Sequence, residues 1–194
     1  MTTLNETLDA QIKANGPDFY KNQVPGYVYS NLCEKFSVRP YQQDAFGRFN
    51  FFWKDYFDKP SGPTQLLFHM ATGSGKTLVI AGLIIYLYEQ GYRNFLFFVN
   101  STNIIDKTKD NFFNNSSSKY LFANNISIGD KQVKIKEVDN FQIANQEDIN
   151  IVFSTIQGLH SRINAPKENS IISAITPSAH NNPIAVVLKP IVFQ

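Results

Sequence analysis

The sequence is poor in cysteine and has no apolar run long enough to cross a membrane. Cys33 is the single cysteine in 194 residues, so no disulfide can form within the chain, and this usage fits a reducing compartment. The longest apolar run, residues 78–88, falls well short of the ~20 residues that a membrane-spanning helix requires. The start of the chain lacks the basic and apolar segments of a secretory signal. We therefore expect a cytoplasmic protein that does not associate with membranes.

Charged residues are also scarce. They make up 18% of the sequence, and the net charge of +2 is too small to indicate nucleic-acid binding by itself. Neither Asp nor Glu occurs after Glu168. Hydrophobic residues make up 43%, which supports a folded domain, and the length suits one domain better than two.

A glycine-rich loop lies between two apolar stretches. Residues 65–69 (Gln-Leu-Leu-Phe-His) predict a short buried strand, and the run from Leu78 predicts a helix that continues to about Gln90. Between them, Met-Ala-Thr-Gly-Ser-Gly-Lys-Thr at 70–77 follows the order of strand, loop and helix of a Walker A phosphate-binding loop. The general pattern has glycine where this chain has Met70, and Gly73 supplies the flexibility instead.

The residue types of this loop suit a nucleoside triphosphate with Mg²⁺. The glycines can adopt positive φ and bring backbone N–H groups close to phosphate oxygens, and the next helix directs its N-terminus at the same anion. Lys76 would contact the β and γ phosphates, and the Thr77 hydroxyl would bind Mg²⁺. A glycine turn before a core helix is the alternative. The expected nucleotide-binding residues of the loop are Thr72, Gly73, Ser74, Gly75, Lys76 and Thr77.

A second helix, some thirty residues before the loop, carries a candidate for reading the nucleotide base. Pro40 suits the first helical turn, which places Gln42 near the helix N-terminus. The Gln42 amide can donate and accept together, as an adenine edge requires. An ordinary surface glutamine is the alternative. The aromatic residues that follow at helical spacing, Phe49, Phe52 or Trp53 and Tyr56, are expected in the core.

Two further apolar runs, residues 94–99 and 149–155, predict buried parallel strands. Ser101 and Thr102 follow the first run, and Thr155 ends the second. Open α/β sheets bind ligands at this C-terminal edge, so these hydroxyls are candidates for contacting the phosphate backbone of a nucleic acid. Helix capping is the alternative. The lysines at 131, 134 and 136 favour a solvated face with an edge strand at 134–136, because two acidic residues follow them closely.

Together these motifs resemble the first motor domain of superfamily 2 helicases and translocases of the DEAD/DEAH type. Among these, the chain looks most like the restriction subunit of type III restriction–modification enzymes. Residues 39–42 (Arg-Pro-Tyr-Gln) are similar to the adenine-reading element and 70–77 to motif I. Residues 97–102 are similar to motif Ia, and 152–157 to the strand-end threonine motif. Of these only motif I is specific by itself.

The resemblance implies an α/β, RecA-like P-loop NTPase domain that uses ATP and Mg²⁺. We expect a mainly parallel sheet with helices on both faces. The parts would be an N-terminal leader at 1–37 that packs on the domain, a partial motor domain at 38–169, and an atypical tail at 170–194. The leader is expected to contain a short helix at 3–13, and the tail a strand at 185–188.

The family's next element, motif II, has no counterpart. In the family an Asp-Glu-x-His sequence follows a hydrophobic strand, and its carboxylates hold Mg²⁺ and orient the attacking water. Here the candidate strand 185–188 is followed by Lys189 and Pro190, so no catalytic residue can be assigned. The resemblance therefore implies a truncated or frameshifted N-terminal part of a DNA-translocating restriction endonuclease subunit, incomplete at its C-terminus. This chain would bind ATP without efficient hydrolysis, and its partners would be double-stranded DNA, bound weakly, and a modification methyltransferase subunit.

Two functions from other classes stay open on the sequence alone. The first is a non-catalytic module that binds a protein partner in a nucleotide-dependent way. The second is a small P-loop kinase or GTPase. A GTPase would carry an Asn-Lys-x-Asp base reader, which is absent, and a kinase would need an arginine-rich lid, whereas the only arginines are Arg39, Arg48, Arg93 and Arg162.

Overall fold

The computed structural model describes residues 3–54, 64–99, 101–142, 144–155 and 157–158, together with the backbone of 184–188. The chain divides into two compact units, Met1–Leu83 and Ile84–Gln194. Helix α4 (Lys76–Glu89) contributes its first half to one unit and its second half to the other. Each unit is described by itself.

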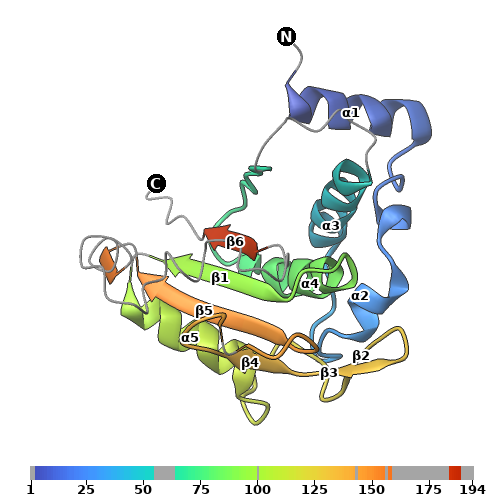
Figure 1. Cartoon of the computed structure of the whole chain (residues 1–194). Coiled ribbons are helices and arrows are strands. Elements are labelled where there is room, and N and C mark those ends of the chain that lie inside the picture. The colour runs from blue at the N-terminus through green and yellow to red at the C-terminus, as the bar shows by residue number, and fades with distance from the viewer. Residues whose placement is uncertain are drawn as a thin grey trace. The chain divides into compact units, whose positions relative to one another are not determined.

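Helices make up the regular structure of the first unit (Figure 1). They are α1 (Leu4–Asn15), the short 3-10 helix η1 (Lys21–Gln23), α2 (Gly26–Ser30), α3 (Pro40–Trp53) and the start of α4. The helix predicted at 3–13 is α1, which starts with a capping box in which Glu6 N donates to Thr3 Oγ1 and Thr3 N donates to Glu6 Oε2. As predicted, Pro40 is the first residue of α3, where a backbone N–H would have no partner within the helix.

Tyr20 lies at the centre of the core of the first unit. Its side chain is fully buried and packs in one cluster with the buried side chains of Leu8 and Phe51, and its hydroxyl donates to Leu8 O at 2.7 Å. Arg48 lies 5.1 Å from the centre of the Tyr20 ring and pairs with Asp9 of α1 at 2.8 Å. These contacts fix α1 to α3. Burial raises the pKa of Tyr20 to about 12.

A parallel four-stranded sheet organises the second unit, in the order β4-β5-β1-β6 (Figure 1). Its strands are β1 (Asn94–Val99), β4 (Ile135–Glu137), β5 (Ile149–Thr155) and β6 (Ile184–Leu188). β1 pairs on one side with β5 and on the other with β6. The strands predicted at 94–99, 149–155 and 185–188 are confirmed, and the predicted edge strand is β4. A separate antiparallel hairpin, β2 (Ile126–Ile128) and β3 (Lys131–Val133), was not predicted.

Apolar side chains cover both faces of this sheet. Helix α5 (Thr102–Phe113) packs against β1, β4 and β5, and its Phe112 meets the Phe97 ring edge-on at 6.2 Å between ring centres. On the opposite face one cluster contains Leu96, Phe98, Phe141 and Val152. All six residues of β1 are buried, which explains why Phe95 to Val99 form a continuous apolar run rather than an alternating one.

The strand predicted at residues 65–69 is wrong. The structure assigns no strand between 64 and 70, and half-buried residues alternate there with exposed ones. Leu67 is 81% exposed. An apolar run of this length predicts a buried strand only where a neighbouring strand is available to pair with it, and periodicity cannot show that. The predicted helix after the loop is α4, and Gly91 follows it with φ of 96°. Tyr56 lies outside the described residues.

Among the residues that the structure describes, no helix is both long and apolar enough to cross a membrane.

Candidate functional site

The glycine-rich loop at 70–75 leads directly into helix α4. Gly73 and Gly75 both have φ of 78°, in the left-handed region that glycine adopts without strain. Lys76 and Thr77 are the first two residues of α4. The order of loop and helix that the motif requires is therefore present, although the residues before it are not a strand.

The Lys76 side chain folds back and binds two backbone carbonyls of the loop. Its Nζ donates to Met70 O at 3.0 Å and to Ala71 O at 2.8 Å. An ammonium group has three protons, so one is left for an anion. These two bonds hold the positive charge at the rim of the loop.

Several backbone N–H groups of the loop make no hydrogen bond within the described part of the chain. Ser74 N donates to Ala71 O and Leu78 N to Gly75 O, but no such bond is found for the N–H groups of Thr72, Gly73, Gly75 and Lys76. The Ser74 hydroxyl is buried and likewise has no partner among the described residues. A turn of unpaired N–H donors at a helix N-terminus is a site that suits an anion, so the loop fits a phosphate group.

Gln42 contacts this loop from the first turn of α3. Its side chain is buried, its Oε1 accepts from Arg39 N at 2.9 Å, and its Nε2 donates to Ser74 O at 2.9 Å. The Tyr41 hydroxyl donates to the same Ser74 carbonyl at 3.0 Å. A Cβ atom at Gly75 would overlap Gln42 Nε2, so glycine is needed there for this close approach as well as for its positive φ.

The structure thus brings the predicted base-reading residue to the predicted phosphate loop. Each polar atom of the Gln42 amide has one partner within the chain, which leaves one proton and one lone pair. An adenine edge requires one donor and one acceptor of this kind. Recognition of a base by Gln42 stays a prediction. The involvement of Tyr41 was missed, because nothing in its sequence context distinguishes it from an exposed aromatic residue.

In the second unit, Ser101, Thr102 and Thr155 lie at one edge of the sheet, because Val99 pairs with Thr155 at the ends of β1 and β5. Thr155 Oγ1 accepts from Gly158 N at 2.9 Å, so this hydroxyl caps the following turn, as the alternative interpretation stated. Ser101 is the N-cap residue of α5 but its side chain makes no capping bond. DNA contacts by the three hydroxyls stay a prediction.

Two carboxylates just before β5 are paired with lysines. Glu147 binds Lys131 at 2.8 Å, and Asp148 binds Lys136 at 2.6 Å. The hydrogen bond from Lys131 lowers the pKa of Glu147. Since both acids precede Ile149, they lie at the N-terminal ends of the strands, opposite the edge that carries Thr155. Strand β6 lies beside β1, and the sequence after it carries no carboxylate.

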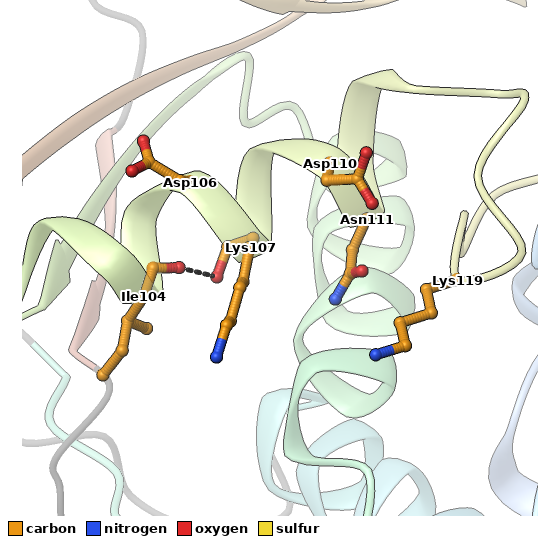
Figure 2. A pocket seen from close by; sticks show the side chains of 7 residues that line it. Ile104, Asp106, Lys107, Asp110, Asn111 and Lys119 are labelled. Atoms are coloured by element: carbon orange, nitrogen blue, oxygen red, sulfur yellow. Dashed lines mark hydrogen bonds between the residues drawn. The ribbon is translucent and has the colours of Figure 1, made fainter.

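A shallow groove of about 540 Å³ runs along α5 (Figure 2). Figure 2 shows the side chain of Lys107 pointing away from the carboxylate of Asp106. Asp110 accepts from Asn114 and Ser117, and these bonds, that of Ser117 first, lower its pKa. Acidic and basic groups are balanced, so the groove favours no class of ligand. Its lining residues are Ile104, Asp106, Lys107, Thr108, Asp110, Asn111 and Lys119.

Comparison with known proteins identifies the family of this chain. Residues 35–181 match the family model of the type III restriction enzyme, res subunit. Over 157 residues the chain is 41% identical to a protein of Haemophilus influenzae described as a probable type III restriction-modification enzyme HindVIP Res subunit. The alignment covers 78% of this chain but 30% of that relative. No solved structure matches the chain. The chain therefore belongs to the family of type III restriction enzyme Res subunits, with the α/β, RecA-like P-loop fold that its motifs predicted.

Proposed function

We propose that this chain is the ATP-binding part of a helicase-like restriction subunit. The observation that carries the proposal is the set of N–H donors of Thr72, Gly73, Gly75 and Lys76, which have no partner among the described residues and lie at the N-terminus of α4. The positive end of the helix dipole and these donors favour the same anion. Membership of the Res family makes a nucleoside triphosphate a better candidate than a lone phosphate, and it argues against a small kinase or GTPase.

Each residue of the site then has a distinct role. The remaining proton of the Lys76 ammonium binds the β and γ phosphates, and the Thr77 hydroxyl is a ligand of Mg²⁺. Bound Mg²⁺ neutralises phosphate charge. Gln42 orients the adenine through the donor and acceptor that its contacts with Arg39 and Ser74 leave over.

We further propose that these 194 residues bind ATP without efficient hydrolysis. Hydrolysis needs a carboxylate near the metal and an oriented water, and an arginine finger alone contributes ~10³–10⁵ in rate. Glu147 and Asp148 are held by lysines at the N-terminal ends of the strands. No acidic residue occurs in the sequence after Glu168.

The activity of the whole restriction subunit would be ATP-dependent translocation along double-stranded DNA in support of DNA cleavage. This subunit would act in the cytoplasm together with a modification methyltransferase subunit. Ser101, Thr102 and Thr155 would contact only the phosphate backbone. Binding of DNA by this chain is then weak, independent of sequence and strongly reduced by salt.

Isothermal titration calorimetry with ATP and Mg²⁺ tests the nucleotide site. Loss of a charge-assisted contact costs ~1.5–3 kcal/mol, so Lys76→Ala should weaken ATP binding about ten- to hundred-fold. Lys107→Ala, a matched change on the exposed face of α5, should leave binding unchanged. Unchanged ATP affinity in a folded Lys76→Ala protein would refute the site. Gln42→Ala should narrow the preference for ATP over GTP, and equal binding of both nucleotides by the wild type would exclude base reading.

A nucleotide-dependent binding module is the second candidate, favoured by the lack of a carboxylate after β6. In that case ATP would change the affinity for a protein partner while turnover, with or without DNA, stays at the level of the Lys76→Ala variant. DNA-stimulated hydrolysis that disappears in Lys76→Ala would contradict both the binding module and the proposed lack of turnover.

A further inference from the structure

One backbone carbonyl of the phosphate loop, that of Ser74, accepts two hydrogen bonds from α3. Gln42 Nε2 donates to it at 2.9 Å and the Tyr41 hydroxyl at 3.0 Å. The Tyr41 oxygen in turn accepts from Arg39 Nη1 at 3.2 Å. Because a carbonyl oxygen has two lone pairs, these two donors satisfy it fully.

The direction of this carbonyl determines where the next N–H group points. The peptide bond between Ser74 and Gly75 is planar and trans, so the Ser74 C=O and the Gly75 N–H point in opposite directions. Donors on α3 hold the carbonyl on one side, and the unpaired Gly75 N–H therefore faces the other way. The two glycines that flank Ser74 have φ of 78° and offer little resistance to rotation of this peptide.

We propose that Tyr41 is a positioning residue of the phosphate loop, which keeps the Gly75 N–H aimed at phosphate by holding the Ser74 carbonyl through its hydroxyl. This inference rests on the proposed nucleotide site and extends it. Gln42 supplies one of the two bonds to this carbonyl, and the proton and lone pair that remain on its amide are assigned to the base. Tyr41 has no such second task, and its ring is exposed, so its contribution to the loop comes from the hydroxyl.

Tyr41→Phe removes the hydroxyl and keeps the ring. Loss of one neutral hydrogen bond should reduce the affinity for phosphate ligands roughly 2- to 10-fold. The reduction should be the same for ATP, GTP and inorganic tripolyphosphate, each measured with Mg²⁺ by calorimetry, because the tether acts on the phosphates and not on the base. Tyr29→Phe is the matched control: its ring packs against Phe46, and no hydrogen bond of its hydroxyl is found in the described part of the chain.

Hydrogen exchange of the ligand-free protein provides a second measurement. Exchange of the hydrogen-bonded amides of Ser74, Leu78 and Val79, whose acceptors are the loop carbonyls of Ala71 and Gly75, should accelerate roughly 2- to 10-fold in Tyr41→Phe and not in Tyr29→Phe, with an unchanged melting temperature. If the wild type binds no phosphate ligand, the proposed function fails, while the exchange data still decide whether the tether exists. Unchanged exchange, or a loss restricted to ATP, would overturn the proposal. The proposal would also be overturned if Tyr41→Phe bound ATP as tightly as the wild type while Tyr41→Leu bound ATP weakly. That result would show that the Tyr41 ring stacks on the base.

Discussion

Replacement of Gly75 by alanine should destabilise the first unit through two separable effects. A residue with a Cβ atom costs about 1–2 kcal/mol in the left-handed region, where Gly75 has φ of 78°. The new Cβ would also overlap Gln42 Nε2. Gln42 must then give up its bond to Ser74 O, which adds about 0.5–1.5 kcal/mol. Together the loss of unfolding free energy should be about 1.5–3.5 kcal/mol.

The chain contains its own control for this experiment. Gly73 has the same φ of 78°, but a Cβ there would meet nothing within 4 Å. Gly73→Ala should therefore show only the backbone strain, about 1–2 kcal/mol. The difference between the two variants measures the contact between the loop and Gln42.

Urea unfolding followed by the fluorescence of Trp53 is the appropriate assay, because this residue is the single tryptophan and ends α3. A double-mutant cycle with Gln42→Ala should recover the part due to overlap, since the smaller side chain leaves room for the new Cβ. Equal destabilisation by Gly73→Ala and Gly75→Ala, or strictly additive effects in the cycle, would refute the argument that Gly75 is required by the approach of Gln42.

Three further changes test contacts within the first or the second unit. Tyr20→Phe removes the buried bond to Leu8 O and should cost about 0.5–1.5 kcal/mol in urea unfolding. The folded-state pKa of Tyr20 is raised from 10.0 to about 12, so the stability that this hydroxyl contributes is fully present below pH 10 and is lost as the pH rises towards 12. The free energy of unfolding of Tyr20→Phe should not show this decrease, which unfolding at pH 8 and pH 11 measures. Asn150→Ala removes the amide that donates to Asn145 O and Asp148 O, of which Asn145 O keeps the bond from Asp148 N; the change should cost about 1–3 kcal/mol, and an unchanged denaturation midpoint would contradict this. Lys131→Gln should raise the depressed pKa of Glu147 towards 4.5 in an NMR titration; the stabilisation by this pair is present above pH 4.5 and is lost as the pH falls through the lower folded-state pKa.

The sequence predicted those elements whose signals are local. The mainly apolar sequences of β1 and β5 predicted these strands without knowledge of their neighbours, since a strand buried on both faces is rich in apolar residues. Pro40 marked the start of α3 for a similar reason, because the first turn of a helix has no use for its N–H. The positive φ of Gly73 and Gly75 followed from the spacing of the motif.

Features that depend on distant contacts were not predictable in the same way. The strand expected at 65–69 is absent, because a strand needs a partner and an apolar run does not reveal one. Strands β2 and β3 have three residues each, too few for a periodic pattern. The bonds from Tyr41 and Gln42 to Ser74 join residues that are 33 and 32 positions apart. Only the fold shows that these side chains share one carbonyl.

The pairing of β1 with β6 has a consequence for biosynthesis. Strand β1 has one edge that only β6 covers among the described residues, and β6 comes from Ile184–Leu188, far along the chain. At a synthesis rate of ~5–20 residues per second, the ribosome needs roughly 4–17 s to proceed from Val99 to Ile184. During that interval the nascent chain carries Asn-Phe-Leu-Phe-Phe-Val with an unpaired strand edge, an apolar and uncharged segment of the kind that aggregates. Chaperone dependence of expression should therefore be set by how soon residues 184–188 emerge, and not by the final stability of the sheet.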